Sequence, residues 1–369
     1  MNCDDIIQMH DSWLTVNSIV GCTNGCKYCF LQSTCDNLAK PKYKVSATEA
    51  IEMLFSSKYY EPTIPICLLP NTDPFLNQNN IDYTKELLRL ISIKNISNPI
   101  ILITKCLIPE TFCTYLKELK DSGMNLVVYL SYSGLGKEYE PNINHDDIKL
   151  NFQNLALNGI KMIHYYRPLI PANSNANDIE KMLDFVNQYT NVSVISGLKV
   201  KPDFIDKIDF WDAVINNKEE CINAAGIWPE SAYNYFGEDY KHSQRVFQLN
   251  KCGLCEILEI PNTAFYKTFE CTNCNHCSEE QRKRCELAKR IENIDERLKE
   301  LLIKIDKYNE NIVIEKQDNS ILIKNGNLTV GDVSYLTFML GYKVTIDSKL
   351  ETDNYFNSVY TNAKNLIVK

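Results

Sequence analysis

The sequence lacks any long apolar run and any secretory leader. No stretch approaches the roughly 18 consecutive apolar residues that a membrane-spanning helix needs. The first residues, MNCDDIIQMHDSW, contain neither the basic segment nor the apolar segment of a signal peptide. We therefore expect a cytoplasmic protein that has no membrane partner.

The chain also lacks a surplus of positive charge. Its 369 residues include 39 Lys and Arg against 47 Asp and Glu, which gives a net charge of −8. Binding nucleic acid regardless of sequence needs an extended basic surface, so the composition argues against it, although a local basic groove is compatible with this charge. With 44% hydrophobic and 23% charged residues, the chain is typical of a globular protein with one large domain and one or two small ones.

Cysteine, by contrast, is abundant and unevenly distributed. The chain has 15 cysteines, and nine of them fall in two clusters, one near the N-terminus and one between positions 252 and 285. Clustered cysteines in a reducing compartment favour metal binding over a disulfide framework.

The first cluster lies in the stretch GCTNGCKYCF, residues 21–30, where Cys22, Cys26 and Cys29 form the pattern C-x3-C-x2-C. Two glycines allow this loop to fold round an inorganic centre and to aim three thiolates at it. A 4Fe–4S cluster normally takes four cysteines, so three leave one iron open to a ligand that is not protein. A three-cysteine zinc site, a redox pair of Cys26 and Cys29, and ordinary buried thiols are the alternatives.

At these residues the chain resembles the radical S-adenosylmethionine superfamily, whose motif has this spacing and an aromatic residue before the last cysteine, here Tyr28. The resemblance implies that the open iron binds the amino and carboxylate groups of S-adenosylmethionine. It also implies that one electron, supplied by a donor such as flavodoxin or ferredoxin, cleaves this cofactor to a 5′-deoxyadenosyl radical. The cofactor carries the chemistry, and the protein supplies orientation and shelter. The resemblance covers roughly the first half of the chain.

The first 200 residues alternate between predicted strands and helices. Apolar runs predict strands at 13–20, 64–69, 99–104, 125–131, 160–167 and 192–199. Amphipathic stretches predict helices at 46–57, 82–93, 109–122, 146–158 and 177–189, the first with Ser46 as N-cap and Glu49 completing a capping box. Because such crossovers produce parallel sheets, we expect an α/β fold with a partial (β/α)6 parallel barrel, which the resemblance also implies.

The chemistry of parallel barrels lies at the carboxyl ends of their strands. Thr72 and Asp73 follow the second strand, and this Thr-Asp-Pro sequence resembles the spore photoproduct lyase-like branch, with a capped turn as the alternative. The same resemblance places Ser131, after the fourth strand, against the cofactor. Arg167, at the end of the fifth strand, suits a carboxylate or phosphate, or a surface ion pair. Cys106, after the third strand, is a candidate hydrogen-atom donor, or else a small buried apolar residue.

The second cluster predicts a second metal site. Its cysteines are Cys252, Cys255, Cys271, Cys274, Cys277 and Cys285. The first four match the spacing of a zinc ribbon, with hairpin strands at 256–259 and 265–269. The last four would instead serve an auxiliary 4Fe–4S cluster, and four sulfurs suit either metal. The ribbon spacing favours zinc, in which case the last two cysteines are spare.

We predict four parts of the chain: a barrel at 1–200, a segment closing its open side at 201–250, a cysteine-rich metal-binding module at 251–285, and a helix with a small C-terminal α/β appendage at 286–369. The charged, helical stretch 278–308 is predicted to be an exposed docking helix. Short strands are expected at 312–316 and 321–324.

The main functional hypothesis is a radical S-adenosylmethionine enzyme that abstracts hydrogen in lyase or repair-type chemistry on a nucleic-acid or nucleotide substrate. Peptide modification is the alternative within this class, because auxiliary clusters often accompany it. An alternative of another class is a non-enzymatic zinc-ribbon interaction protein. A shared barrel does not determine the substrate.

Overall fold

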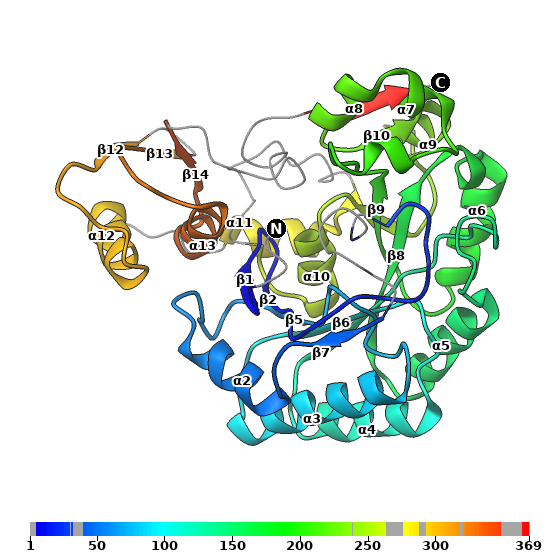
Figure 1. Cartoon of the computed structure of the whole chain (residues 1–369), viewed down its shortest axis with the longest axis horizontal. Helices are drawn as coiled ribbons and strands as arrows, with labels where there is room; N and C mark the ends of the chain where they lie inside the picture. Colours follow the sequence, from blue (N-terminus) through cyan, green and yellow to red (C-terminus); the bar gives the residue numbers. More distant parts are fainter. Residues whose placement is uncertain are drawn as a thin grey trace.

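The computed structural model describes residues 5–29, 31, 40–237, 239–262, 276–287, 293–316, 320–347 and 364–368. These residues form an eight-stranded sheet in the order β1-β2-β5-β6-β7-β8-β9-β11 (Figure 1). Its strands are β1 Ile7–Met9, β2 Leu14–Val16, β5 Ile66–Leu68, β6 Ile100–Thr104, β7 Leu126–Leu130, β8 Lys161–Leu169, β9 Val192–Gly197 and β11 Arg245–Phe247. All neighbours pair in parallel except β1, which runs antiparallel to β2.

Helices cover the convex side of this curved sheet (Figure 1). They are α2 Ala47–Ser56, α3 Gln78–Lys94, α4 Glu110–Asp121, α5 His145–Leu157 and α6 Ala176–Val186. The capping box predicted for Ser46 and Glu49 is present at the start of α2. Each predicted strand range overlaps a strand of the sheet in the expected order, so the α/β class with a large, mostly parallel sheet is confirmed.

Successive strand residues face opposite sides of the sheet, and both sides are apolar, as expected for parallel strands buried on two faces. The convex side packs Leu68, Leu102 and Val128 against the outer helices. The concave side packs Tyr129 and other strand residues against α10 Asn250–Leu258, which lies within the curve of the sheet (Figure 1).

The segment predicted to close the barrel contributes to the sheet itself. It contains β11, a seventh parallel strand, which pairs with β9. The other elements between β8 and β11 are η1 Pro171–Asn173, η2 Ile205–Lys207, α7 Asp212–Asn216, α8 Lys218–Asn223, β10 Ile227–Pro229 and α9 Glu230–Tyr235. The sequence gives no clear signal for β11, because this strand has only three residues and lies among many aromatic and polar ones.

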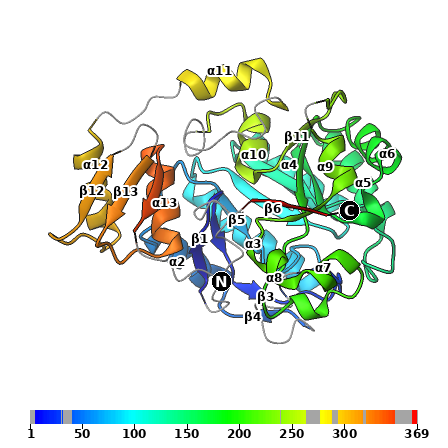
Figure 2. The ribbon, with the colours of Figure 1, turned by 90° about the horizontal axis from the view of Figure 1, so that it is seen from above.

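The C-terminal part packs against the first strand of the sheet. It comprises α11 Glu279–Leu287, α12 Ile294–Lys304, β12 Val313–Lys316, β13 Ser320–Lys324, α13 Val330–Leu340, β14 Lys343–Ile346 and β15 Leu366–Val368. The two predicted strands appear as β12 and β13, which form a three-stranded sheet with β14. Figure 2 shows this sheet and α13 at one end of the molecule, beside β1 and α2. The last strand, β15, pairs in parallel with β10.

The prediction of an exposed docking helix is wrong. The described residues of that stretch form two helices, α11 and α12, and not one. The apolar stripe of α12, formed by Leu298, Leu301 and Leu302, is buried in the protein's own core. An apolar stripe indicates that a partner exists, and here the partner belongs to the same chain. No helix among the described residues is long and apolar enough to cross a membrane.

One buried carboxylate joins the C-terminal part to the connection between α2 and β5. Asp332, in the first turn of α13, accepts hydrogen bonds of 2.8 Å from the Thr329 amide and from the Tyr59 hydroxyl. It also pairs with Lys58 at 3.1 Å. Burial acts to raise the pKa of Asp332, but the Thr329 and Tyr59 hydrogen bonds and the Lys58 charge together hold it below its usual value.

We predict that Asp332→Asn lowers the free energy of unfolding by about 2 to 3 kcal/mol at neutral pH, because it removes a buried partner of Lys58 and weakens the Tyr59 hydrogen bond. The Asp332 pKa is lower in the folded state than in the unfolded state. Its stabilising effect is therefore present above the unfolded-state pKa and is lost as the pH falls through the folded-state pKa. Urea unfolding of both proteins over a pH series measures the difference, which should shrink in acid.

Tyr59→Phe is the matched control, because it removes one hydrogen bond and keeps the charge. It should cost about 1 kcal/mol and weaken the pH dependence without abolishing it, because the Thr329 hydrogen bonds and the Lys58 charge still lower the Asp332 pKa. An Asp332→Asn difference that stays constant in acid would contradict the assignment.

Candidate functional site

The cysteine loop, residues 21–29, follows β3 Ile19–Val20, which pairs with β4 Lys42–Tyr43 in a separate two-stranded sheet. Gly21 opens the loop with a φ of +110°, and a Cβ atom there would lie 2.6 Å from the Lys40 carbonyl oxygen. Only glycine fits this close backbone approach. Gly25, inside the loop, also has a positive φ, of +69°. The two glycines therefore shape the loop, as the sequence predicted.

Hydrogen bonds hold this loop at the carboxyl end of β5. The Gly21 amide donates to the Asn71 carbonyl at 3.0 Å, and the Thr72 hydroxyl donates to the Gly21 carbonyl. The loop thus lies at the edge of the sheet where parallel barrels place their chemistry.

Asp73 connects this edge to the end of the next strand. Its carboxylate accepts from the Phe75 amide at 3.0 Å, the Thr104 hydroxyl at 2.7 Å and the Lys105 amide at 2.7 Å. Burial raises the pKa of Asp73, although these three hydrogen bonds oppose the rise. Both carboxylate oxygens therefore bind groups of the protein, and residues 73–76 form a turn, as in the alternative interpretation, although Asn77 and not Asp73 caps α3. A cofactor contact for Thr72 and Asp73 stays a prediction.

Cys106 lies against the cysteine loop. Its sulfur is 3.5 Å from the side-chain amide nitrogen of Asn24, which is inside the loop. The Asn151 side chain donates to the Cys106 carbonyl at 2.8 Å and fixes the backbone there. Burial and then the nearby Asp73 carboxylate raise the pKa of the Cys106 thiol, so the thiol keeps its hydrogen at neutral pH.

A second loop, between β7 and α5 (residues 131–144), supports the cysteine loop from the other side. The Lys27 amide donates to the Tyr139 carbonyl at 2.9 Å. The Asn142 side chain donates to the Thr23 carbonyl at 2.8 Å. This glycine-containing loop therefore holds the cysteine loop in place.

Glu140 of the same loop is the centre of a buried polar network. Its side chain is 0% exposed, and it pairs with Lys105 at 2.6 Å and with His145 at 2.8 Å. The Tyr28 hydroxyl donates to the same carboxylate. Burial acts to raise the pKa of Glu140, but the Lys105 charge and the hydrogen bonds from His145 and Tyr28 lower it to about 2.

The sequence analysis does not predict this buried network. Lys105 and Glu140 are 35 positions apart, and neither belongs to a spaced motif. The one signal was that Lys105 directly follows an apolar strand, at the edge where polar site residues are expected.

The three thiols of the cysteine loop are largely removed from water. Burial raises the pKa of Cys26 to about 12 and also raises those of Cys22 and Cys29. Reactive cysteine pairs have lowered pKa values, so this environment disfavours the redox pair. Metal coordination removes the proton from a buried thiol, and these thiols suit that use.

The three loop sulfurs do not form one compact group. Among the described residues, only Glu180, Asp184 and His242 bring three cysteine, histidine or carboxylate donor atoms within 4.8 Å of one another. The cysteines of a multi-iron cluster bind separate irons, whereas the ligands of one zinc ion lie about it at roughly 2.3 Å. The three-cysteine zinc site stays an alternative to the cluster.

Ser131 and Arg167 lie at the ends of β7 and β8. Ser131 is buried, and its carbonyl accepts from the Lys105 ammonium at 3.3 Å. The Arg167 guanidinium lies 4.2 Å from the centre of the Tyr165 ring and donates to its hydroxyl. The structure thus joins Ser131 to the Glu140 network and packs Arg167 on an aromatic residue. Their contacts with a cofactor stay predictions.

The second cysteine cluster does not have a ribbon's knuckle at Cys252 and Cys255. Both residues lie one turn apart on α10, and the predicted strand at 256–259 is wrong because residues 256–258 continue this helix. Cys271, Cys274 and the strand predicted at 265–269 lie outside the described residues. Cys277 packs against the apolar concave face.

Asn262 brings two of these thiols together. Its side-chain nitrogen lies 3.3 Å from the Cys252 sulfur, and its backbone amide lies 3.3 Å from the Cys285 sulfur. The Gln281 side chain donates to Cys285 as well, at 3.4 Å. Three N–H groups therefore point at two sulfurs, an arrangement that stabilises thiolates.

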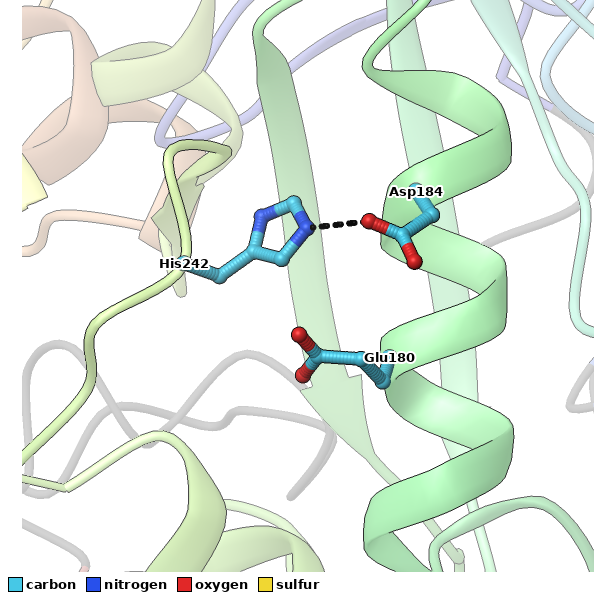
Figure 3. Close-up of side chains that lie close together, drawn as sticks. All are labelled: Glu180, Asp184 and His242. Atoms are coloured by element: carbon cyan, nitrogen blue, oxygen red, sulfur yellow. Dashed lines mark hydrogen bonds and ion pairs between the residues drawn. The ribbon is translucent and has the colours of Figure 1, made fainter.

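Glu180, Asp184 and His242 form a different cluster on the outer helix α6 and the loop before β11 (Figure 3). His242 Nε2 lies 3.2 Å from Asp184 Oδ1, and His242 Nδ1 accepts the Gln244 amide hydrogen at 2.9 Å. Because Nδ1 accepts, the neutral ring carries its proton on Nε2 and has no lone pair there for a metal. This cluster fixes the loop to α6.

Comparison with known proteins gives similarities of fold alone. No protein-family model matches the chain, and no curated protein matches its sequence. One similar solved structure is spore photoproduct lyase complexed with dinucleoside spore photoproduct, with 12% identity, a TM-score of 0.42, and coverage of 53% of this chain and 59% of that chain. Another is anSMEcpe with bound AdoMet, with 16% identity, a TM-score of 0.38, and coverage of 55% and 61%. A third is a radical SAM methyltransferase from Sphaerobacter thermophilus, with 16% identity, a TM-score of 0.41, and coverage of 53% and 59%.

The chain resembles radical S-adenosylmethionine proteins, with spore photoproduct lyase among them. It spans roughly three fifths of the length of these proteins. With TM-scores below 0.5 and identities of 12 to 16%, the chemistry of this chain has to be argued from its own residues.

We predict that Gly21→Ala abolishes iron loading, because the new methyl group would collide with the Lys40 carbonyl and displace the cysteine loop. Gly123→Ala is a matched control, since Gly123 has a similar φ of +101° and has nothing within 4 Å of the added atom. Both variants carry the backbone strain of about 1 to 2 kcal/mol. Iron content after anaerobic reconstitution, with thermal unfolding as a check on folding, distinguishes them. Equal iron in both variants would show that the loop tolerates displacement.

Proposed function

We propose that the protein is a radical S-adenosylmethionine enzyme. The observation that carries this proposal is the cysteine loop. It places three thiols, of which Cys26 is buried and Cys22 and Cys29 are partly buried, at the carboxyl edge of a parallel sheet, and Thr72 and the β7–α5 loop hold it there. Cys22, Cys26 and Cys29 would hold a 4Fe–4S cluster and leave one iron for S-adenosylmethionine. When S-adenosylmethionine is bound, the reduced cluster would cleave it to supply a 5′-deoxyadenosyl radical.

The protein's own residues position and shelter that site. Thr72 and Asp73 tie the loop to two strand ends, and Ser131 and Arg167 provide polar groups at the ends of the next two strands. The β7–α5 loop lies against the cysteine loop and would help to exclude water from the site. A small electron-transfer protein such as flavodoxin or ferredoxin would reduce the cluster.

We further propose that the chemistry is lyase-like, acting on a nucleic-acid base or a nucleotide. Cys106 supports the lyase type of reaction. Its sulfur lies beside the cysteine loop, and its raised pKa keeps it as a thiol, which can return a hydrogen atom to a carbon radical. The Thr-Asp-Pro sequence supports the substrate class. Peptide modification is the second candidate, favoured by the second group of thiols at Cys252, Cys255 and Cys285.

Cys26→Ala should abolish reductive cleavage of S-adenosylmethionine, because a two-cysteine loop cannot hold the cluster. The measurement is 5′-deoxyadenosine formed under dithionite by the anaerobically reconstituted protein. Cys113→Ala is the control, since Cys113 is a fully buried thiol on α4 among the core residues. It should retain cleavage at close to the wild-type rate, with a stability loss of about 1 kcal/mol. Retained cleavage in Cys26→Ala would refute the proposal, and a wild-type protein that neither binds iron nor cleaves the cofactor would favour a non-enzymatic role.

We also propose a second metal centre that includes Cys252, Cys255 and Cys285, and we assign iron–sulfur and not zinc. The ribbon that favoured zinc is replaced by a helix, and the described thiols do not converge as the ligands of one ion do. Hydrogen bonds from Asn262 and Gln281 to the sulfurs are typical of protein control of an iron–sulfur cluster.

Metal analysis tests this second centre. The wild type should bind about eight iron atoms per chain, and a Cys252→Ala, Cys255→Ala double variant about four, while the double variant keeps 5′-deoxyadenosine formation from the first cluster at a measurable level. Four iron atoms and one zinc per chain in the wild type would overturn the iron assignment and restore zinc.

A further inference from the structure

The buried network round Glu140 contains a close pair of opposite charges. Lys105 and Glu140 are 14% and 0% exposed, and their charged atoms lie 2.6 Å apart. Removing two charges from water costs several kcal/mol, and apolar residues of similar size often stabilise a fold as well or better. A pair in this position therefore calls for another explanation.

Lys105 faces the cysteine loop. Its ammonium lies 5.6 Å from the centre of the Tyr28 ring, and Tyr28 directly precedes Cys29. The ammonium also donates to the Ser131 carbonyl at 3.3 Å, and the next residue, Cys106, has its sulfur 3.5 Å from the Asn24 side chain inside the loop. Lys105 thus places a positive charge beside the cysteine loop in a region of low dielectric constant.

Glu140 fixes that charge in place. It binds the Lys105 ammonium and the Tyr28 hydroxyl through the same oxygen, Oε1, while His145 holds the other oxygen, Oε2. Glu140 thereby holds the Lys105 ammonium beside Tyr28, the residue before Cys29.

We propose that Lys105 and Glu140 set the reduction potential of the cluster held by Cys22, Cys26 and Cys29. Reduction adds one negative charge to the cluster, so the Lys105 charge stabilises the reduced state and raises the potential. Glu140 is a positioning residue that orients Lys105 and Tyr28, and its own charge lowers the potential by less. This inference rests on the proposed function, because it presumes the cluster.

The test is the midpoint potential of the reconstituted protein, measured by anaerobic redox titration with electron paramagnetic resonance of the reduced cluster. Lys105→Gln should lower the potential, so that the ratio of reduced to oxidised cluster at a fixed applied potential falls about tenfold, or 59 mV for a one-electron couple. Glu140→Gln should shift it in the opposite direction. The double variant should lie between the two, and Lys105→Arg should restore the wild-type value.

Lys117→Gln is the control, because Lys117 forms an exposed pair with Asp121 on α4 and should leave the potential unchanged. If Lys105 and Glu140 acted only in packing, their substitution would alter the iron content. The sign of any change in midpoint potential would then not follow the sign of the charge removed. Unchanged potentials in Lys105→Gln and Glu140→Gln, or shifts of the same sign in both, would overturn the proposal. If Lys105→Gln does not load iron, the midpoint potential of Glu140→Gln tests the inference alone. A Glu140→Gln potential equal to or lower than that of the wild type contradicts the inference.

Failure of the inference is distinguishable from failure of the proposed function. A wild-type protein that binds four irons in this loop and forms 5′-deoxyadenosine, with potentials insensitive to the pair, would refute the charge effect alone. A wild-type protein without a cluster would refute both.

Discussion

Hydrogen bonds between the cysteine loop and the ends of the parallel strands are the constraint on which the site depends. Thr72 donates to the first residue of the loop, and Asp73 ties the same turn to the end of β6. Since β5 and β6 are rigid, buried strands, these few contacts fix a glycine-containing loop that has little regular structure of its own. Loops that carry function are commonly held this way by a rigid scaffold.

Burial of charge is the second feature of the site. Asp73, Lys105 and Glu140 lie at one edge of the sheet, and each has its charge satisfied by partners that belong to other elements. Such a network connects the cysteine loop, the end of β6 and the β7–α5 loop into one unit. Substitution of one member should therefore alter the hydrogen bonds of the others. The effects of single substitutions in this network on stability should not be additive.

Much of the fold could be predicted because buried parallel strands are continuous apolar runs. Residues 99–104 and 125–131 each contain a strand close to the expected limits, β6 and β7. The cysteine loop was equally evident, since its ligands are local in sequence. Glu140 was not, because nothing near it in the sequence indicates that tertiary contacts would bury it beside Lys105.

The second cysteine cluster shows why spacing alone is ambiguous. Cys252 and Cys255 are three positions apart, which fits a zinc knuckle and also one turn of a helix. The helix forms because its apolar residues, with Leu254 among them, pack on the concave face of the sheet. Spacing is ambiguous for α12 as well. Its apolar stripe indicates that the helix packs against something, but it does not indicate that this is the protein's own core.

The most direct test of the central claim is electron–nuclear double resonance on the reduced protein with S-adenosylmethionine labelled with ¹⁵N at its amino group. An open iron in the Cys22, Cys26, Cys29 site predicts a hyperfine coupling between the cluster and the labelled nitrogen. A reduced 4Fe–4S cluster in this loop that shows no such coupling at saturating cofactor would contradict the account.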